Sequence, residues 1–130
     1  MEIYKKFIDV WHNVSVKAAL AASDLVGKKD KISADKAAVD ASRNTLNKSD
    51  MRGQIVIGEG ELDEAPMLYV NEKVGNLNGE EFDIAVDPLE GTNFTAKNLP
   101  NALSVLAVAR KNNMLKSPDV YMEKIAIGPK

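Results

Sequence analysis

Apolar residues recur at steps of three and four along the N-terminal part of the chain, the spacing that lines one face of an α-helix. The stripe runs through Ile3, Phe7, Trp11, Val14, Ala18, Ala21 and Leu25. Gly27 follows and predicts the end of this helix. A stripe of this kind, with the only Trp of the chain in it, is typical of core packing, so we assign it no chemistry.

A second helix is predicted in the segment SADKAAVDASRNTLNKSD, residues 33–50. Ser33 is suited to be its N-cap, because a serine hydroxyl accepts a hydrogen bond from an amide of the first turn. Asp35 would then lie in that turn beside the positive end of the helix dipole. This placement accounts for Asp35 without any function.

Short apolar runs follow the two helices and predict strands. They are IVI at 55–57, FDIAVD at 82–87, NALSVLAVARK at 101–111 and DVYMEKIAIGP at 119–129. The segment MLYVNEKVG, residues 67–75, is ambiguous between a strand and a short helix. Two helices followed by strands with short connections predict an α+β fold, in which the helices are layered on a mixed or mostly antiparallel sheet.

Composition restricts the classes of function. The chain has 130 residues, which suits one domain, and its 17 basic and 19 acidic residues form no long block of one sign. We therefore expect no nucleic-acid partner and a small-molecule ligand instead. The N-terminal segment has neither a signal-peptide core nor a membrane span, and the absence of cysteine fits a reducing cytoplasm, so a cytoplasmic location is expected. His12 is the only histidine and predicts a helix-face residue rather than a catalytic or zinc-binding one.

Acidic residues collect where two of the predicted strands end. They are Glu59, Glu61, Asp63 and Glu64 after the first apolar run, and Asp87 and Glu90 after FDIAV. Asp-Pro and Glu-Gly also favour turns, so a loop of solvated acids is one interpretation. The other is a cation site, because carboxylates about 4 Å apart repel by around 4 kcal/mol at an effective dielectric near 20 unless a proton or cation lies between them. Without cysteine and with one histidine, the available ligands suit Mg²⁺ or Mn²⁺.

Such a site would suit phosphoryl transfer to water, which two divalent ions about 3.5 to 4 Å apart can promote. Gly91 lets the backbone approach a ligand closely, and the amides that open the next segment could receive a phosphate. The Thr92 hydroxyl could orient a water molecule.

Longer blocks of sequence identify a resemblance. DPLEGT, residues 87–92, is similar to the signature of the lithium-sensitive, metal-dependent sugar phosphatases. The blocks IVIGEGELDEAPMLYVNEKVG, DIAVDPLEGT, PNALSVLAVA and PDVYMEKIAIGP together resemble the bacterial class II fructose-1,6-bisphosphatases across nearly the whole chain. Inositol monophosphatases usually carry Asp where this chain has Glu90, and this favours the class II bisphosphatases.

The resemblance implies a set of site residues. The Mn²⁺ or Mg²⁺ ligands would be Asp35, Glu59, Asp87 and Glu90, and the Leu89 carbonyl could join them. The substrate would contact Glu90, Gly91, Thr92 and Tyr121. Thr92 would position the attacking water, and Asp63 and Lys31 would lie close to the reaction.

The activity implied is hydrolysis of the 1-phosphate of fructose 1,6-bisphosphate, a sugar bisphosphate, in gluconeogenesis, and a link to glycerol metabolism. Another sugar phosphate, such as sedoheptulose 1,7-bisphosphate or an inositol monophosphate, is an alternative substrate. Family members are much longer, so residues 1–130 resemble an N-terminal portion, and the full-length form is expected to be a homo-oligomer. The remainder would supply a further acidic ligand and most sugar contacts, so we expect the 130-residue chain alone to be inactive. A non-catalytic module that binds metal or phosphate is the second class of function left open.

Overall fold

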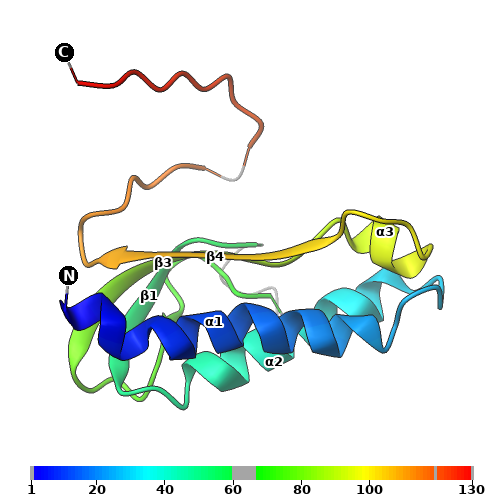
Figure 1. Ribbon diagram of the computed structural model, residues 1–130, viewed down its shortest axis with the longest axis horizontal. Helices are drawn as coiled ribbons and strands as arrows, with labels where there is room; N and C mark the ends of the chain where they lie inside the picture. Colours follow the sequence, from blue (N-terminus) through cyan, green and yellow to red (C-terminus); the bar gives the residue numbers. More distant parts are fainter. Residues whose placement is uncertain (1, 60–66, 119, 130) are drawn as a thin grey trace.

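The computed structural model describes residues 2–59, 67–118 and 120–129 (Figure 1). Its elements, in chain order, are α1 (Glu2–Ser23), α2 (Lys31–Leu46), β1 (Met51–Ile57), β2 (Lys73–Val74), β3 (Glu80–Glu90), α3 (Thr92–Ala96) and β4 (Leu103–Arg110). Both long helices lie on one face of a four-stranded sheet with the order β2-β1-β3-β4. The α+β prediction is therefore confirmed. Within the described residues, no helix combines the length and the apolar character needed to cross a membrane.

The predicted apolar stripe does form the buried face of α1. Phe7, Val14 and Ala18 are almost fully buried, and Trp11 is partly exposed. At the C-terminal end of the stripe Ala22 is buried, whereas the predicted Ala21 is partly exposed. The helix ends at Ser23, and the chain turns at Gly27, whose φ of 75° lies in the left-handed region that glycine tolerates best. The Gly27 amide donates to the Thr95 carbonyl, so this turn is fixed to the end of α3.

The start of α2 differs from the prediction that Ser33 is the N-cap. Asp30 caps the helix instead, because its extended backbone turns its carboxylate toward the first turn. It accepts one hydrogen bond from the Ser33 amide at 3.0 Å and another from the Ser33 hydroxyl at 2.7 Å. Asp35 consequently lies beyond the first turn of α2, and the helix dipole does not account for it.

The sheet is mixed because β1 and β3 run parallel, while β2 pairs with β1 and β4 pairs with β3 in antiparallel fashion. The ambiguous segment 67–75 contains only the two-residue strand β2. The predicted strand at 119–129 is absent from the part that the structure describes, where residues 120–129 have no regular structure and are exposed. The tail does not pair with the sheet, so its apolar residues have no strand partner.

The strand β3 runs farther than predicted. FDIAVD was expected to end at Asp87, yet β3 continues through Pro88 and Leu89 to Glu90. Proline has no N–H group, and the ladder is irregular at this point, because three steps along β3 from Asp87 to Glu90 match two steps along β4 from Val105 to Leu103. The extra residue is a β-bulge, which changes the direction of the following side chains.

The core between the helices and the sheet is centred on Phe82 of β3. Its ring packs edge-on against Phe7 and Trp11 of α1, with centroid distances of 5.2 and 5.1 Å. A smaller apolar cluster forms at the other end of the sheet, where Leu89 packs with the alanines Ala18, Ala22, Ala34 and Ala38 of the two helices. These clusters fix both helices to the sheet at either end of β3.

A partly buried ion pair joins α2 to the segment that precedes β2. Arg43 donates through Nε to Glu72 Oε1 at 2.7 Å and through Nη2 to Glu72 Oε2 at 3.1 Å, and it also donates to the Met67 carbonyl. The Glu72 side chain is only 10% exposed. Removing one partner of such a pair leaves the other charge buried without compensation.

We expect Arg43→Met to lower the free energy of unfolding by about 3 kcal/mol, because Glu72 would stay buried without its cation. Lys36→Met is the control, since it breaks the exposed pair of Lys36 with Asp40 and should cost less than about 0.5 kcal/mol. Urea denaturation followed by circular dichroism measures both values. Equal losses for the two variants would contradict a structural role for the buried pair.

Candidate active site

The parallel pairing of β1 with β3 brings the two groups of acidic residues to one edge of the sheet. Ile57 pairs with Ala85 across these strands, and the same register continued by two residues places Glu59 beside Asp87. This register depends on an irregularity between Ile55 and Ile57, where β1 has one residue more than β3. The bulge in β1 therefore aligns the acid that follows one strand with the acid near the end of the other.

The bulge in β3 turns its own two acids to the same side. Asp87 and Glu90 are three residues apart and would point to opposite faces of a regular strand. Because the bulge inserts one residue, their partners on β4 are Val105 and Leu103, which are two apart and share a face. Val86 and Leu89 face the helices instead, as their burial in the core shows.

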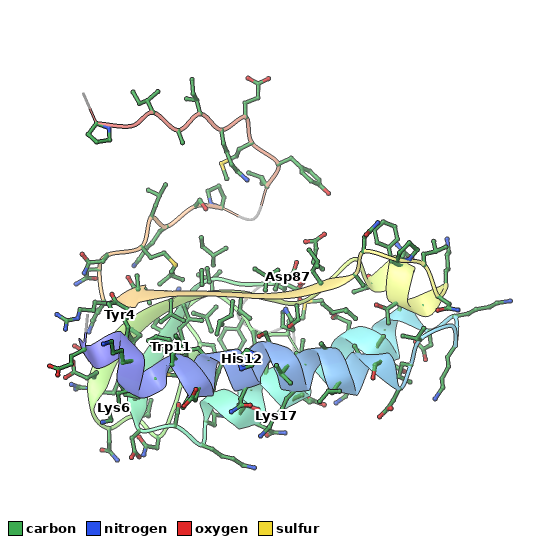
Figure 2. The ribbon with its side chains drawn as sticks, in the orientation of Figure 1. Tyr4, Lys6, Trp11, His12, Lys17 and Asp87 are labelled. Carbon is green, nitrogen blue, oxygen red and sulfur yellow. The ribbon has the colours of Figure 1, made fainter. Side chains whose placement is uncertain are left out.

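Glu59, Asp87 and Glu90 consequently line one cavity of about 340 Å³, together with Gly91 and Thr92. Figure 2 shows Asp87 on the sheet, between the N-terminal end of α1 and the helix α3. Of the acids that follow the first predicted strand, Glu59 is therefore a neighbour of Asp87 and Glu90. Glu61, Asp63 and Glu64 lie outside the described residues. Asp87 is partly buried, Glu90 is exposed, and the chain turns at Gly91 as its sequence favours.

Gly91 has a backbone that a larger residue would strain. Its φ is 82°, and a Cβ atom added there would lie 2.9 Å from Cδ2 of Phe94. The Gly91 carbonyl accepts hydrogen bonds from the amides of Phe94 and Thr95, which starts the short helix α3 at Thr92. The glycine thus lets the chain turn from β3 into α3 while Thr92 stays at the cavity.

The surroundings of Asp87 favour the protonated form of its carboxyl group. Burial is the main cause that raises its pKa, to about 6, and a hydrogen bond with Glu90 and the Glu90 charge add to the rise. Two other hydrogen bonds lower the pKa of Asp87. One is formed with Glu59, and the other comes from the Leu89 amide, which donates to Asp87 Oδ1 at 3.1 Å. The close approach of carboxyl groups thus stabilises a proton on Asp87, and a cation could take the place of that proton.

Asp35 approaches the same end of the sheet from the helix layer. Its neighbours Ala34 and Ala38 pack against Leu89, so α2 carries Asp35 close to the strand end, and Figure 1 shows the start of α2 beside α3. Burial raises the pKa of Asp35, and its Oδ1 atom is buried without a hydrogen-bond partner among the residues described. Asp35 does not line the cavity of the other three acids.

The remaining predicted residues are not brought to this cavity. Lys31 is the first residue of α2 and is exposed, and Tyr121 lies fully exposed in the C-terminal segment. Asp63 lies outside the described residues. Over residues 2–59, 67–118 and 120–129, no three Asp, Glu or His side chains form a ready metal-binding group. The ligand set and the roles of these residues therefore stay predictions.

Two lining residues were not anticipated. Asn93 and Phe94 of α3 face the cavity next to Thr92. Their position directly after the Gly-Thr pair is the only signal in the sequence that could have identified them. Phe94 is 43% exposed, which is unusual for an aromatic side chain and gives the cavity an apolar rim.

Comparison with known proteins identifies the family. A sequence model described as bacterial fructose-1,6-bisphosphatase, glpX-encoded, matches residues 7–130. The chain belongs to this family. It is 56% identical over 116 residues to the class 2 fructose-1,6-bisphosphatase 1 of Escherichia coli, which covers 89% of this chain and 34% of the relative. Identity to the class 2 enzyme of Haemophilus influenzae is 57% over 115 residues, or 88% of this chain and 34% of the relative.

A third relative has a broader name. The D-fructose 1,6-bisphosphatase class 2/sedoheptulose 1,7-bisphosphatase of Thermosynechococcus vestitus is 50% identical over 125 residues, which covers 87% of this chain and 36% of the relative. The chain spans about a third of the length of the curated relatives it matches. The predicted resemblance to class II fructose-1,6-bisphosphatases is confirmed.

The raised pKa of Asp87 has a consequence for stability in the absence of divalent cations. The folded protein holds this proton up to about pH 6, above the ordinary carboxyl value of 3.8, so stability falls as pH rises through this window. We expect Asp87→Asn to stabilise the chain by about 1 kcal/mol at pH 8, where it removes a charge, and by much less at pH 4. Solvent reaches this half-buried group and screens its charge, which keeps the expected gain this small. Thermal unfolding in chelator measures this difference.

The control is Asp9→Asn, which removes an exposed carboxyl group of α1 outside the acidic cavity. A loss of stability for Asp87→Asn at pH 8 would contradict the proposed crowding of carboxyl groups.

Proposed function

We propose that this chain forms part of a metal-dependent phosphatase that hydrolyses the 1-phosphate of fructose 1,6-bisphosphate to fructose 6-phosphate, a step of gluconeogenesis. The observation that carries the proposal is the cavity shared by Glu59, Asp87 and Glu90, with Gly91 and Thr92 beside them. Membership of the family of bacterial fructose-1,6-bisphosphatases supports the reaction and the sugar bisphosphate substrate.

The residues fit a hard divalent cation. The donors are carboxylates, which Mn²⁺ and Mg²⁺ prefer over softer ligands. One buried oxygen of Asp35 has no hydrogen-bond partner within the described residues, and a buried polar atom of this kind is costly unless a ligand satisfies it. Glu59, Asp87, Glu90 and Asp35 would hold the ions, with Mn²⁺ preferred to Mg²⁺ in our proposal.

Divalent ions at such a site supply Lewis-acid activation of water and stabilise charge on the phosphoryl oxygens. The chain supplies the positioning. The Thr92 hydroxyl accepts a hydrogen bond from the attacking water and orients it toward phosphorus, and the left-handed backbone of Gly91 lets the phosphate approach the start of α3. Glu90 would help to hold the ions beside the substrate phosphate, and no covalent phosphoenzyme is needed.

Lys31, Asp63 and Tyr121 are proposed to complete the site, the first two near the reacting groups and the third against the sugar. Lys31 and Tyr121 do not line the acidic cavity, and Asp63 lies outside the described residues. A cytoplasmic location, a role in glycerol metabolism and a homo-oligomeric state of the full-length form also stay predictions.

A second substrate is supported by one specific observation. The relative from Thermosynechococcus vestitus carries sedoheptulose 1,7-bisphosphatase in its name. Sedoheptulose 1,7-bisphosphate is therefore the alternative sugar that a substrate panel should include. An inositol monophosphate is less favoured, because inositol monophosphatases usually carry Asp in place of Glu90.

We expect the full-length gene product to release phosphate from fructose 1,6-bisphosphate only with Mn²⁺ or Mg²⁺, and Asp87→Asn and Glu59→Gln to lower kcat at least a hundredfold, because each removes a carboxylate from the cavity. A phosphate-release assay with and without chelator measures this. Asp9→Asn should retain the activity of the unchanged protein. Undiminished turnover in excess chelator would exclude the metal-dependent mechanism.

We expect the 130-residue chain by itself to bind Mn²⁺ and to release no phosphate, since it carries acidic ligands but spans about a third of its relatives. Isothermal titration calorimetry should detect binding, and Asp87→Asn should weaken it at least tenfold. Full turnover by this chain would contradict the expectation. Metal binding by a full-length gene product that lacks turnover would instead favour a non-catalytic module.

A further inference from the structure

A second cavity lies at the opposite end of the sheet from the acidic one. It has a volume of about 150 Å³ and is found where the parallel strands β1 and β3 begin. The charged residues that line it come from four places in the sequence, namely Arg52 of β1, Lys73 of β2, Glu81 of β3 and Lys111 directly after β4. The uncharged residues of the lining are Gly53, Gln54, Leu77 and Phe82.

The cavity opens on the sheet face that the helices leave uncovered. Met51, Gly53 and Ile55 alternate with Arg52 and Gln54 along β1, and the first three are buried toward the helices. Arg52 and Gln54 therefore point to the other face. The cavity is thus separated from the acidic site by the length of the strands, and no residue lines both cavities.

Positive charge exceeds negative charge in this lining. The Glu81 carboxylate accepts a hydrogen bond from Lys111 Nζ at 2.6 Å. This bond lowers the pKa of Glu81, and the charges of Lys111, Arg52 and Lys73 act in the same direction. All three cations line the same cavity as this carboxylate. After that carboxylate is balanced, the lining keeps an excess of two positive charges.

The internal contacts of the cations leave this excess available to a ligand. Arg52 donates through Nε to the Gly79 carbonyl at 3.1 Å, which fixes its position without neutralising its charge. The Lys73 ammonium takes part in no hydrogen bond or ion pair with the residues that the structure describes, although the Lys73 backbone belongs to the ladder of β2 with β1. Like charges gathered at one place are stabilised by an anion between them.

We propose that this basic cavity binds the phosphoryl group of a small phosphate monoester. A phosphate monoester carries about −1.5 to −2 charges at neutral pH, which matches the excess in the lining. A planar guanidinium and a lysine ammonium are the side chains that suit phosphate oxygens. The half-exposed side chain of Leu77 provides apolar surface for the remainder of the molecule.

This site is independent of the proposed phosphatase activity, because it lies outside the acidic cavity and needs no divalent cation. In a chelator, the acidic cavity repels phosphate, whereas the basic cavity keeps its charge. Binding of phosphate without metal therefore reports on the basic cavity.

The test is a titration of the isotope-labelled 130-residue chain with inorganic phosphate in excess chelator, followed by the amide resonances. We expect saturable shifts at β1, β2 and the residues after β4, weaker binding at high salt, and no saturable shifts at Gly91 and Thr92. Lys73→Gln should weaken binding roughly three- to fivefold, and Arg52→Gln together with Lys73→Gln more than tenfold. Lys17→Gln, which removes an exposed charge from α1 on the other side of the sheet, is the matched control and should bind as the unchanged chain does.

Three results would overturn the proposal: no saturable binding in chelator, equal binding by the Lys73→Gln and unchanged chains, or equal weakening by Lys17→Gln. Succinate at the same concentration distinguishes the phosphoryl group from anions in general, and binding as tight as that of phosphate would refute the phosphate assignment. Should a variant lose the circular dichroism spectrum of the unchanged chain, the same titration of the full-length gene product with Lys73→Gln decides the matter by calorimetry.

Discussion

The parallel pairing of β1 and β3 is the constraint on which the candidate active site depends. Parallel neighbours end at the same edge of a sheet, so acids that follow two separate strands must meet there. Two irregularities refine this meeting, one in β1 between Ile55 and Ile57 and one in β3 between Asp87 and Glu90. Each inserts one residue. The first aligns Glu59 with Asp87, and the second turns Glu90 to the face of Asp87. Each bulge thus changes the face of the sheet on which the following side chains lie.

This concentration of carboxyl groups costs stability, and the structure offsets the cost elsewhere. Asp87 retains a proton to about pH 6 because burial and Glu90 disfavour its charged form. The apolar cluster of Leu89 with the alanines of α1 and α2 holds the strand end in place directly beneath the acids. Farther along β3, the packing of Phe82 against Phe7 and Trp11 contains no titratable group. Apolar side chains on one face of β3 therefore hold in place the strand that carries the acids on its other face.

The two ends of the sheet carry opposite charge. Acids surround the cavity where the parallel strands end, whereas three cations and one acid surround the cavity where they begin. Both cavities are lined by side chains of β3 and of β1 or its continuation that point away from the helices, while the intervening side chains face the helices. The face covered by α1 and α2 (Figure 1) thus carries the apolar core, and the strand ends and the uncovered face carry the charged groups that line the two cavities.

The sequence by itself determined the local features of this protein. The spacing from Phe7 to Ala18 predicted a helix, the apolar runs around Ile55 and Ile84 predicted buried strands, and DPLEGT together with the longer blocks identified the family. Local signals were misleading where two interpretations were possible. Ser33 resembled an N-cap, but Asp30 reaches the first turn; Asp87 resembled a strand end, but β3 continues past Pro88. The segment 120–129 has strand-like residues, but without a pairing partner it forms no strand.

Only the tertiary structure decided which acids are neighbours. A sequence states that Asp87 and Glu90 are three residues apart, yet whether they share a face depends on the register of β3 against β4. It does not state that β1 lies beside β3, which is a contact between distant residues, or that Lys73 and Lys111 approach Glu81. Pairing between strands sets these distances, because the position of a side chain follows from the backbone hydrogen bonds of the whole sheet.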